Sequence, residues 1–351
     1  MKVLAARNDR LGDFMLAWPA LQTLHLSLPE ARLAVLAQAY TAPLARLCKG
    51  VDEVIEDPRE HGELGNARAL ARLLRPSGFD AAVALFSRFD VALGLALARI
   101  PVRVAPATKL AQVFYTHRLT QHRSRSTKPE WVYNLELVEF FLRLLGVDQS
   151  VWAKPPYLTF PLSSLSENRR KLAQRFSVDA TRAWAFIHPG HGGSSPTLPV
   201  DLFARIAGEL AAAGAVPVIS EGPADAVAAD RLAGALGDVE HVRYRSEAGL
   251  DGYARDLAVA DIFISGSTGP LHIAGALDVP TVGFYPHRRS ASALRWQTLN
   301  SDQRRLAFMP PPSAGEHDFS ALDIGAVCGG IRAFLARVAP GRARAATSPR
   351  T

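Results

Sequence analysis

Strand-like and helix-like segments alternate along this chain in two separate series, and this alternation limits the possible folds more than any other feature. In the first series we predict strands at 2–7, 32–37, 53–56, 79–85 and 102–104, with helices near 14–28, 42–48, 63–74 and 89–98. In the second we predict strands at 183–188, 215–220, 240–243, 261–264 and 280–284, with helices near 200–213, 224–236, 250–258 and 270–277. Strands that alternate with helices favour parallel sheets covered by helices.

The two series predict two domains. Residues 151–165 include Pro155, Pro156 and Pro161 and separate the series, so we interpret them as a linker between domains 1–150 and 166–338. A helix at 131–145 closes the first domain, and one within 318–338 closes the second, while the basic tail 339–351 is expected to be disordered. The fold class is therefore α/β, with two Rossmann-like parallel-sheet domains that face a central cleft.

Composition excludes several classes of protein. The two cysteines, Cys48 and Cys328, lack metal-ligand spacing, which fits a reducing cytosol. No apolar run approaches the roughly 20 residues of a membrane span, and the apolar start is too short for a signal peptide. The net charge of +7 favours an anionic partner, but no zinc-finger, RNA-recognition or helix-turn-helix pattern indicates nucleic acid. We expect a cytoplasmic protein that binds anionic lipid or a sugar nucleotide.

The segment Ser265-Gly-Ser-Thr-Gly-Pro-Leu-His272 lies between a predicted buried strand and the helix near 270–277. A Ser/Thr/Gly turn at this point leaves backbone N–H groups unpaired at the positive end of the helix dipole, which is typical of a phosphate-binding site. Ser267 and Thr268 are equally suited to capping the helix. The residues alone leave both interpretations open.

A second turn, Arg7-Asn-Asp-Arg-Leu-Gly-Asp13, follows the first predicted strand. Gly12 permits a tight turn or the close approach of another group to the backbone. Asp13 stands at or next to the start of the following helix, where an aspartate is usually an N-cap. We expect that helix N-terminus to favour the ionised form of Asp13.

Several separated motifs occur together in the chain: Arg10-Leu-Gly-Asp13, Pro19-Ala-Leu21, His188-Pro-Gly190 and the segment that ends at His272. In this order, from residue 2 to about residue 300, they resemble glycosyltransferase family 9, the lipopolysaccharide heptosyltransferases. The resemblance implies the two-domain GT-B fold and an inverting transfer of heptose from ADP-heptose to a lipopolysaccharide inner-core acceptor. It also implies that Asp13 is the general base, with Arg10 and Gly12 at the acceptor site.

The resemblance also indicates where the donor binds. Phosphate contacts are expected in the motif that ends at His272 and in a glycine-rich loop that begins at His188. Asp225 stands where the family has an acid near the nucleoside, although such a residue alone is more often a helix cap. The donor residues are His188, Gly190, Gly192, Gly193, Ser194, Ser267, Thr268, Gly269 and His272, with Asp225 at the nucleoside.

A basic run carries Arg123, Arg125 and Lys128 in the N-terminal domain. Arginine suits bidentate binding of phosphate and carboxylate groups, so we expect this run to contact an anionic, lipid-linked oligosaccharide acceptor at the cytoplasmic face of the membrane. The alternative is a solvated loop. No Asp-x-Asp pair occurs to hold a metal–nucleotide complex, so the reaction is expected to need neither metal nor cofactor.

Two positions depart from the family pattern. Ser267 stands where the family often has an acid, and Ser195-Pro196 replaces a loop lysine, while Arg288 and Arg289 are candidates to supply the missing positive charge. Two alternative functions stay open, and the departures support the second of them. One is a sugar-nucleotide epimerase or hydrolase on the same fold, and the other is a non-catalytic, nucleotide-binding assembly protein derived from a glycosyltransferase.

Overall fold

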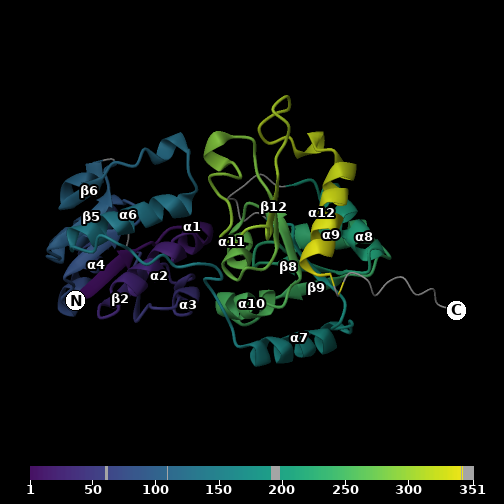
Figure 1. The fold of residues 1–351 in the computed structure, drawn as a ribbon, viewed down its shortest axis with the longest axis horizontal. Coiled ribbons are helices and arrows are strands. Elements are labelled where there is room, and N and C mark those ends of the chain that lie inside the picture. The colour runs from purple at the N-terminus through teal and green to yellow at the C-terminus, as the bar shows by residue number, and fades with distance from the viewer. Residues whose placement is uncertain (60–61, 109, 191–197, 341, 343–351) are drawn as a thin grey trace. The chain divides into compact units, whose positions relative to one another are not determined.

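The computed structural model describes residues 1–59, 62–108, 110–190, 198–340 and 342. The chain divides into two compact units, Met1–Tyr157 and Leu158–Thr351. Each unit contains one six-stranded sheet in which every strand pair is parallel (Figure 1). The sheet of the first unit has the strand order β3-β2-β1-β4-β5-β6, and that of the second has the order β12-β11-β10-β7-β8-β9.

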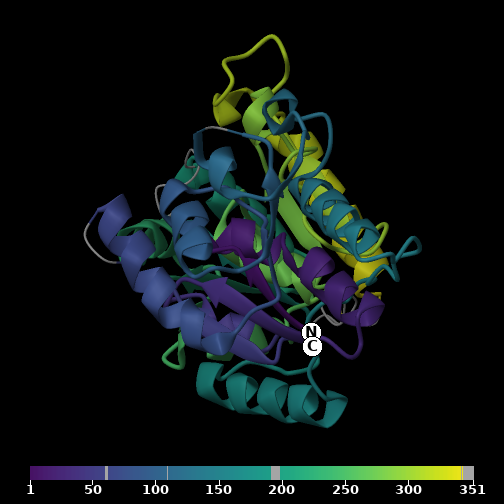
Figure 2. The ribbon, with the colours of Figure 1, turned by 90° about the vertical axis from the view of Figure 1, so that its left-hand side faces the viewer.

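Helices cover both faces of the first sheet (Figure 2). Side chains alternate along each strand, so Leu4 and Ala6 face a core that also contains Leu70 of α4 and Leu95 of α5. Helices α2 and α6 pack against each other, and α6 also contacts β4 and β5. The elements are β1 (Lys2–Ala6), α1 (Leu11–Met15), α2 (Trp18–Ser27), β2 (Arg32–Ala37), α3 (Ala42–Ala45), β3 (Glu53–Glu56), α4 (Glu63–Leu74), β4 (Ala81–Ala84), α5 (Phe89–Leu97), β5 (Val102–Pro106), β6 (His117–Leu119) and α6 (Glu130–Leu144), with short 3-10 turns η1 (Arg75–Ser77), η2 (Leu110–Phe114) and η3 (Arg123–Arg125).

The second sheet is covered in the same way. Its strands and the helices α8, α9 and α12 share one apolar core, which includes Ile187, Phe203, Ile264 and Ile331. The elements are α7 (Leu162–Phe176), β7 (Trp184–His188), α8 (Val200–Ala212), β8 (Val216–Glu221), α9 (Ala226–Leu236), β9 (Val242–Arg245), α10 (Gly249–Leu257), β10 (Ile262–Gly266), α11 (Gly269–Ala276), β11 (Thr281–Phe284), β12 (Arg305–Phe308) and α12 (Ile324–Val338), with η4 (Arg289–Ala291) and η5 (Phe319–Ala321).

The two sheets have the same strand order once the strands of the second are counted from β7. The predicted fold class, two Rossmann-like parallel α/β domains, is confirmed in this respect. In each sheet the order reverses between the first and fourth strands, which are β1 and β4 in one unit and β7 and β10 in the other. Ligands of open α/β sheets bind beyond the carboxyl ends of the strands at such a switch point. We therefore expect functional residues directly after these four strands.

The single helix predicted near 14–28 is two helices. α1 begins at Leu11 and α2 begins at Trp18, with Pro19 in the first turn of α2. Proline has no N–H, and its ring clashes with the carbonyl group four residues earlier, so a helix cannot run unbroken through this point. The break places Asp13 on a short helix of its own.

Three elements were not predicted. Strands β6 and β12 have three and four residues, and β12 is only partly buried, so neither gives a clear apolar pattern. Helix α7 begins at Leu162, inside the predicted linker, and buries only Arg169, Leu172 and Ala173. In the tail, Arg342 donates to Asp261 at 3.0 Å, while positions 341 and 343–351 lie outside the described residues. No helix within the described ranges is both long enough and apolar enough to cross a membrane.

Candidate active site

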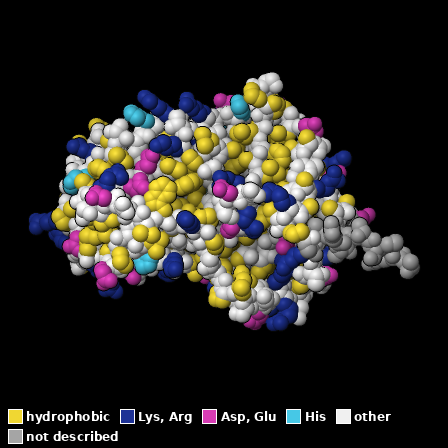
Figure 3. Space-filling model, in the orientation of Figure 1, with side chains coloured by type: hydrophobic (Ala, Val, Ile, Leu, Met, Phe, Trp, Pro, Cys, Tyr) yellow, Lys and Arg dark blue, Asp and Glu magenta, His cyan; other side chains and the backbone are white. Residues whose placement is uncertain are grey.

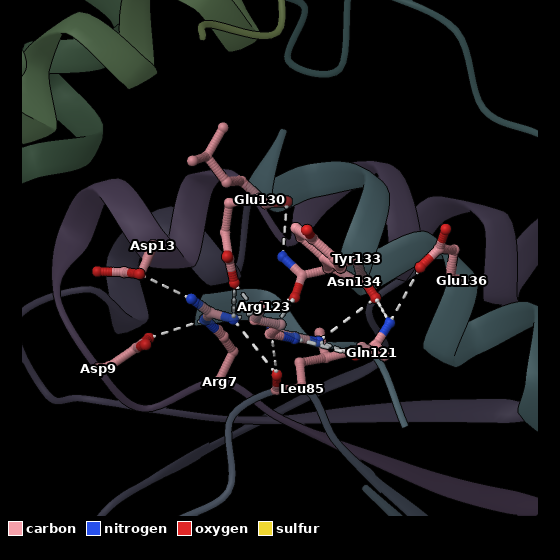
Figure 4. Close-up of polar contacts among 11 residues, drawn as sticks. Arg7, Asp9, Asp13, Leu85, Gln121, Arg123, Glu130, Tyr133, Asn134 and Glu136 are labelled. Carbon is pink, nitrogen blue, oxygen red and sulfur yellow. Dashed lines mark hydrogen bonds and ion pairs between the residues drawn. The ribbon is translucent and has the colours of Figure 1, made fainter. Parts of the chain in front are cut away.

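Arg7 follows β1 at the switch point of the first sheet, and only 1% of its side chain is exposed. A buried guanidinium requires acceptors, because removing a charge from water is costly unless the charge is paired. Nε donates to Asp9 Oδ1 at 2.9 Å, and Nη2 donates to Asp13 Oδ1 at 2.8 Å (Figure 4). Nη1 donates to Glu130 Oε1 at 3.2 Å and to Asn134 Oδ1 at 3.0 Å. Arg7 therefore connects the turn after β1 to helix α6.

Asp13 lies in the first turn of α1, and its carboxylate is held by Arg7 rather than used as a helix cap. The N-cap residue of α1 is Arg10, and its side chain makes no capping hydrogen bond. The side chain of Asp13 remains 22% exposed. The capping interpretation of Asp13 is therefore wrong, and the carboxylate is fixed by a buried cation while it stays accessible.

Burial raises the pKa of the Asp13 carboxyl above its ordinary value. The positive charge of Arg7 opposes this shift, and the negative charge of Glu130 adds to it. The predicted effect of the helix N-terminus, which is to favour the ionised form, is opposed by burial, and α1 has only five residues. A carboxylate with a raised pKa is a stronger base than an ordinary aspartate.

Arg123 belongs to the same cluster, whereas the sequence predicted a contact with an anionic acceptor, with a solvated loop as the alternative. Its Nη1 donates to Glu130 Oε1 at 2.9 Å and to Leu85 O at 3.0 Å, and its Nε donates to Gln121 Oε1 at 2.9 Å. Only 13% of the side chain is exposed. These contacts hold Glu130 between two guanidinium groups, since Arg7 binds the same carboxylate oxygen.

The other predicted acceptor residues lie in different environments. Arg125 and Arg10 are exposed, and Lys128 is exposed and paired with Glu136. Gly12 lies inside α1, where its carbonyl accepts the N–H of Leu16, so of its two predicted uses the tight turn is replaced by a helical turn, and the close approach of another group stays a prediction. A role in acceptor binding stays a prediction for all of them.

A second buried network lies at the carboxyl edge of the same sheet. Asn8 Nδ2 donates to Asp57 Oδ2 at 2.6 Å. Asn66 Nδ2 donates to Asp57 Oδ1 at 3.0 Å and to Asp90 Oδ2 at 2.8 Å, and Arg88 pairs with Asp90. These residues come from the ends of β1, β3 and β4 and from helices α4 and α5. The network fixes the loops around the Arg7 cluster.

In the second unit, His188 ends strand β7 at the switch point. It is 3% exposed, and its Nδ1 lies 3.0 Å from Ser220 O, so Nδ1 carries the proton of that hydrogen bond. Its Nε2 lies 3.6 Å from Asp225 Oδ2. Burial lowers the pKa of His188, while the negative charge of Asp225 opposes that shift. The structure thus brings two predicted donor residues together.

Asp225 precedes helix α9, but its carboxylate does not cap that helix. It accepts the N–H of Gly222 at 3.1 Å and packs against the backbone of Gly190. A Cβ atom added to Gly190 would lie 2.2 Å from Asp225 Cγ, so this glycine is required for the close approach. The capping interpretation is again wrong. The predicted donor residues Gly192, Gly193 and Ser194 lie outside the described residues.

The turn after β10 leads into helix α11 through Thr268, whose backbone is extended. Thr268 is the N-cap residue of α11, yet its side chain makes no capping hydrogen bond, because its hydroxyl pairs with Ser265 Oγ at 2.8 Å. The N–H of Ser267 donates to Phe284 O at 3.1 Å. Contrary to the prediction, this N–H is therefore not available to a phosphate. The N-terminal turn of α11, which begins at Gly269, is left without a side-chain cap.

His272 lies one turn into α11 and is 2% exposed. Its Nδ1 is buried and has no hydrogen-bond partner among the described residues. Burial lowers the pKa of His272 to about 4, so the ring is neutral near pH 7. A buried polar atom without a partner is uncommon and is a candidate for ligand contact.

Sequence reasoning missed Arg7, Asp9, Glu130 and Asn134. Arg7 and Asp9 stand in a turn whose predicted functional residues are Arg10, Gly12 and Asp13, and Glu130 lies 123 residues away from Arg7. The sequence did contain one indication of Arg7. This residue directly follows an apolar strand, and ligands of such sheets bind at the carboxyl ends of the strands.

The surface and the metal-binding groups add little to this picture. On the face that Figure 3 draws, Lys and Arg side chains are dispersed among Asp and Glu. In the part of the chain that the structure describes, no three His, Cys, Asp or Glu side chains are grouped as a metal site would require.

A solved structure with a similar fold is that of the Escherichia coli ADP-heptose lps heptosyltransferase II. The TM-score is 0.78 with 22% sequence identity, and the match covers 96% of this chain and 99% of that chain. Together with the two Rossmann-ordered sheets, this likeness defines the class of protein as one with the GT-B glycosyltransferase fold.

The family is shown by sequence. The model of glycosyltransferase family 9 (heptosyltransferase) matches residues 67–307. A Haemophilus influenzae protein named "Putative glycosyltransferase" is 40% identical over 88% of this chain and 89% of its own length. The lipopolysaccharide heptosyltransferase 2 of Salmonella typhimurium is 27% identical over 81% of this chain and 82% of its own. The chain belongs to glycosyltransferase family 9, and it is a glycosyltransferase.

Proposed function

We propose that this glycosyltransferase is an inverting, metal-independent heptosyltransferase that moves heptose from ADP-heptose to a lipopolysaccharide inner-core acceptor. The observation that carries the proposal is Asp13, an accessible carboxylate that a buried arginine fixes at the switch point of the first sheet. The donor and acceptor classes come from the relatives, whose names specify ADP-heptose and lipopolysaccharide.

In the proposed reaction, Asp13 accepts the proton of an acceptor hydroxyl as that oxygen attacks the anomeric carbon of the donor. The bond from the anomeric carbon to the β-phosphate oxygen breaks, and its electron pair leaves with ADP. Attack from the side opposite to ADP inverts the configuration. The raised pKa of Asp13 supports this role, because a stronger base takes more of the proton in the transition state.

The donor is assigned to the second unit. The uncapped N-terminus of α11 at Thr268 and Gly269, with Nδ1 of His272, is proposed to bind the pyrophosphate. His188 and Gly190 are proposed to line the same site, and Asp225 to accept a hydrogen bond from the ribose. Ser267 is proposed to contribute through its hydroxyl, since its N–H is already bonded.

The acceptor is assigned to the first unit, around Arg10, Gly12 and Asp13. Arg125 and Lys128 are proposed to contact the anionic groups of a lipid-linked oligosaccharide at the cytoplasmic face of the membrane, because both side chains are exposed. Arg123 is proposed to act indirectly, since its guanidinium is occupied by Glu130, Gln121 and Leu85.

The departures from the family pattern bear on donor binding. Ser267 is half-buried, and Ser195-Pro196 lies outside the described residues. Arg288 and Arg289 are exposed and are proposed to supply the positive charge that the loop lysine provides elsewhere in the family.

The test is a matrix of nucleotide sugars and core acceptors incubated with the full-length protein. We expect ADP to be released from ADP-heptose only when acceptor is present, with a new glycosidic bond of inverted configuration in the product. Donor consumption without acceptor would instead indicate an epimerase or hydrolase. Tight ADP binding without turnover in any combination would indicate a non-catalytic binding protein.

A further inference from the structure

Two carboxylates share one edge of a single buried guanidinium beside the proposed base. Asp9 accepts from Nε of Arg7 and Asp13 accepts from Nη2, so each receives one hydrogen bond where a lone carboxylate would receive two (Figure 4). The third nitrogen, Nη1, is directed to Glu130, Asn134 and Leu85. We propose that Asp9 is a positioning residue that makes Asp13 a stronger base by competing with it for Arg7.

This proposal rests on the proposed function, because it assigns Asp9 to the proton-transfer step at Asp13. Among the described residues, Asp9, Asp13 and Glu130 all form ion pairs with Arg7, and Glu130 also pairs with Arg123. Asp9 and Asp13 therefore share the positive charge of one guanidinium when both are ionised. A carboxylate beside a second ionised carboxylate in a buried setting takes up a proton more readily.

Other charged groups surround Asp9 and Asp13. Arg10 adjoins Asp13 on α1, and Asp9 contributes to the field at Arg88, which precedes α5. Both carboxylates and Arg59 contribute to the field at Tyr40, which follows β2. The groups that face the pair are thus Arg7, Arg10, Tyr40, Arg59, Arg88, Arg123 and Glu130.

Burial raises the pKa of Asp9 to about 6, and the negative charge of Asp13 acts in the same direction. Asp9 is 15% exposed, so solvent only partly screens the interaction. Above about pH 6 Asp9 is ionised and shares the positive charge of Arg7 with Asp13. Asp13 is then a stronger base, because less of that charge stabilises its ionised form. Below that pH Asp9 is protonated, and Asp13 receives more of the stabilising charge of Arg7 and becomes a weaker base.

The test is a titration of Asp13 in the full-length protein and in Asp9→Asn, followed by carbon-13 NMR of labelled aspartate carboxyls. Asp13→Asn identifies the resonance. We expect the apparent pKa of Asp13 to be lower in Asp9→Asn than in the parent, because a like charge has been removed from its neighbourhood. Asp9→Glu keeps the charge and should keep most of the effect. Glu53→Gln removes an exposed carboxylate from the same unit and should change nothing.

Turnover provides a second measurement. The acid limb of the kcat/KM profile should move to lower pH in Asp9→Asn by the same amount, with kcat lowered about three- to tenfold at pH 8 and the donor KM unchanged. Superimposed titrations of Asp13 in the two proteins would overturn the inference. So would a raised acceptor KM without any shift, because Asp9 would then contact the acceptor itself. If the parent protein shows the NMR shift but no turnover, the proposed function fails and the inference about Asp13 stands.

Discussion

At the switch point of the first sheet, one buried arginine holds three carboxylates, whereas at that of the second sheet burial lowers the pKa of two histidines, His188 and His272. The strand order is the same in both sheets, so the backbone does not cause the difference. It comes from the residues at the carboxyl ends of the strands: Arg7 after β1, His188 at the end of β7 and Thr268 after β10.

This contrast shows how one backbone can serve two tasks. A cluster that pairs its own charges orients a carboxylate and controls its proton affinity, as needed for general-base catalysis. The neutral ring of His272 and the N-terminus of α11, which has no side-chain cap, instead suit the binding of a charged ligand. The first arrangement suits an acceptor hydroxyl, and the second suits a pyrophosphate.

The two regions should also respond to pH in opposite ways. Asp9 has a raised pKa in the folded protein, so its contribution to stability is present at low pH and is lost as the pH rises through about 6. His272 has a lowered pKa, so its contribution is present above the ordinary histidine value and is lost as the pH falls towards about 4.

The largest expected effect is on turnover. Asp13→Asn removes the base but keeps the shape of the side chain and a hydrogen bond to Arg7, so kcat should fall by roughly 10² to 10⁴. ADP affinity should not change, because the donor is assigned to the second unit. Steady-state ADP release and calorimetry with ADP measure the two quantities. Turnover near that of the parent would show that the charged cluster has no catalytic role.

The next effect is on stability. Arg7→Met leaves three carboxylates without their common partner and should lower the free energy of unfolding by about 3 to 5 kcal/mol, measured by urea denaturation. Arg68→Met is the matched control, because Arg68 is exposed on α4 and its loss should change stability by less than about 0.5 kcal/mol. Equal losses of unfolding free energy in Arg7→Met and Arg68→Met would show that the pairing of Arg7 with three carboxylates does not stabilise the first unit.

The fold was largely predictable because it depends on local patterns. Apolar strands such as 2–7 and 183–188 alternate with helical segments, and that order is sufficient to predict parallel sheets. The break between α1 and α2 was also encoded locally, by Pro19, but the amphipathic pattern of 14–28 concealed it. Short, half-exposed elements such as β12 lacked a pattern to detect.

The candidate site was predictable only where a motif marked it. Asp13, His188 and Thr268 stand in such motifs, but their hydrogen bonds depend on partners far along the chain. Glu130 contacts Arg7 although 123 residues separate them, and Asp225 contacts the backbone of Gly190 although helix α8 and strand β8 lie between them in the sequence. No local propensity encodes those pairs, since burial and shared partners create them only in the folded chain.

The pH dependence of stability tests the neutral region. His272→Gln removes a group whose unfolded pKa is near 6.5 and whose folded pKa is about 4. The parent should therefore lose about 1 to 2 kcal/mol more stability than the variant between pH 7 and pH 5, as measured by urea denaturation. His317→Gln, at an exposed position, should follow the parent. If the free energy of unfolding changes equally with pH in the parent and in His272→Gln, the buried ring is not kept neutral.

The smallest expected effect concerns the packing of Asp225 against Gly190. Gly190→Ala forces that carboxylate to move, because the new Cβ would lie 2.2 Å from Asp225 Cγ, and we expect ADP affinity to fall about tenfold by calorimetry, or about 1.4 kcal/mol. Gly208→Ala is the matched control: it lies within α8, an added Cβ meets no described atom within 4 Å, and alanine should stabilise the helix by about 0.4 to 1 kcal/mol. Because the Arg7 cluster belongs to the other unit, Gly190→Ala should leave the titration of Asp13 unchanged. An unchanged ADP affinity in Gly190→Ala would show that Asp225 does not contribute to the donor site. The N-terminus of α11 would then be the principal element of that site.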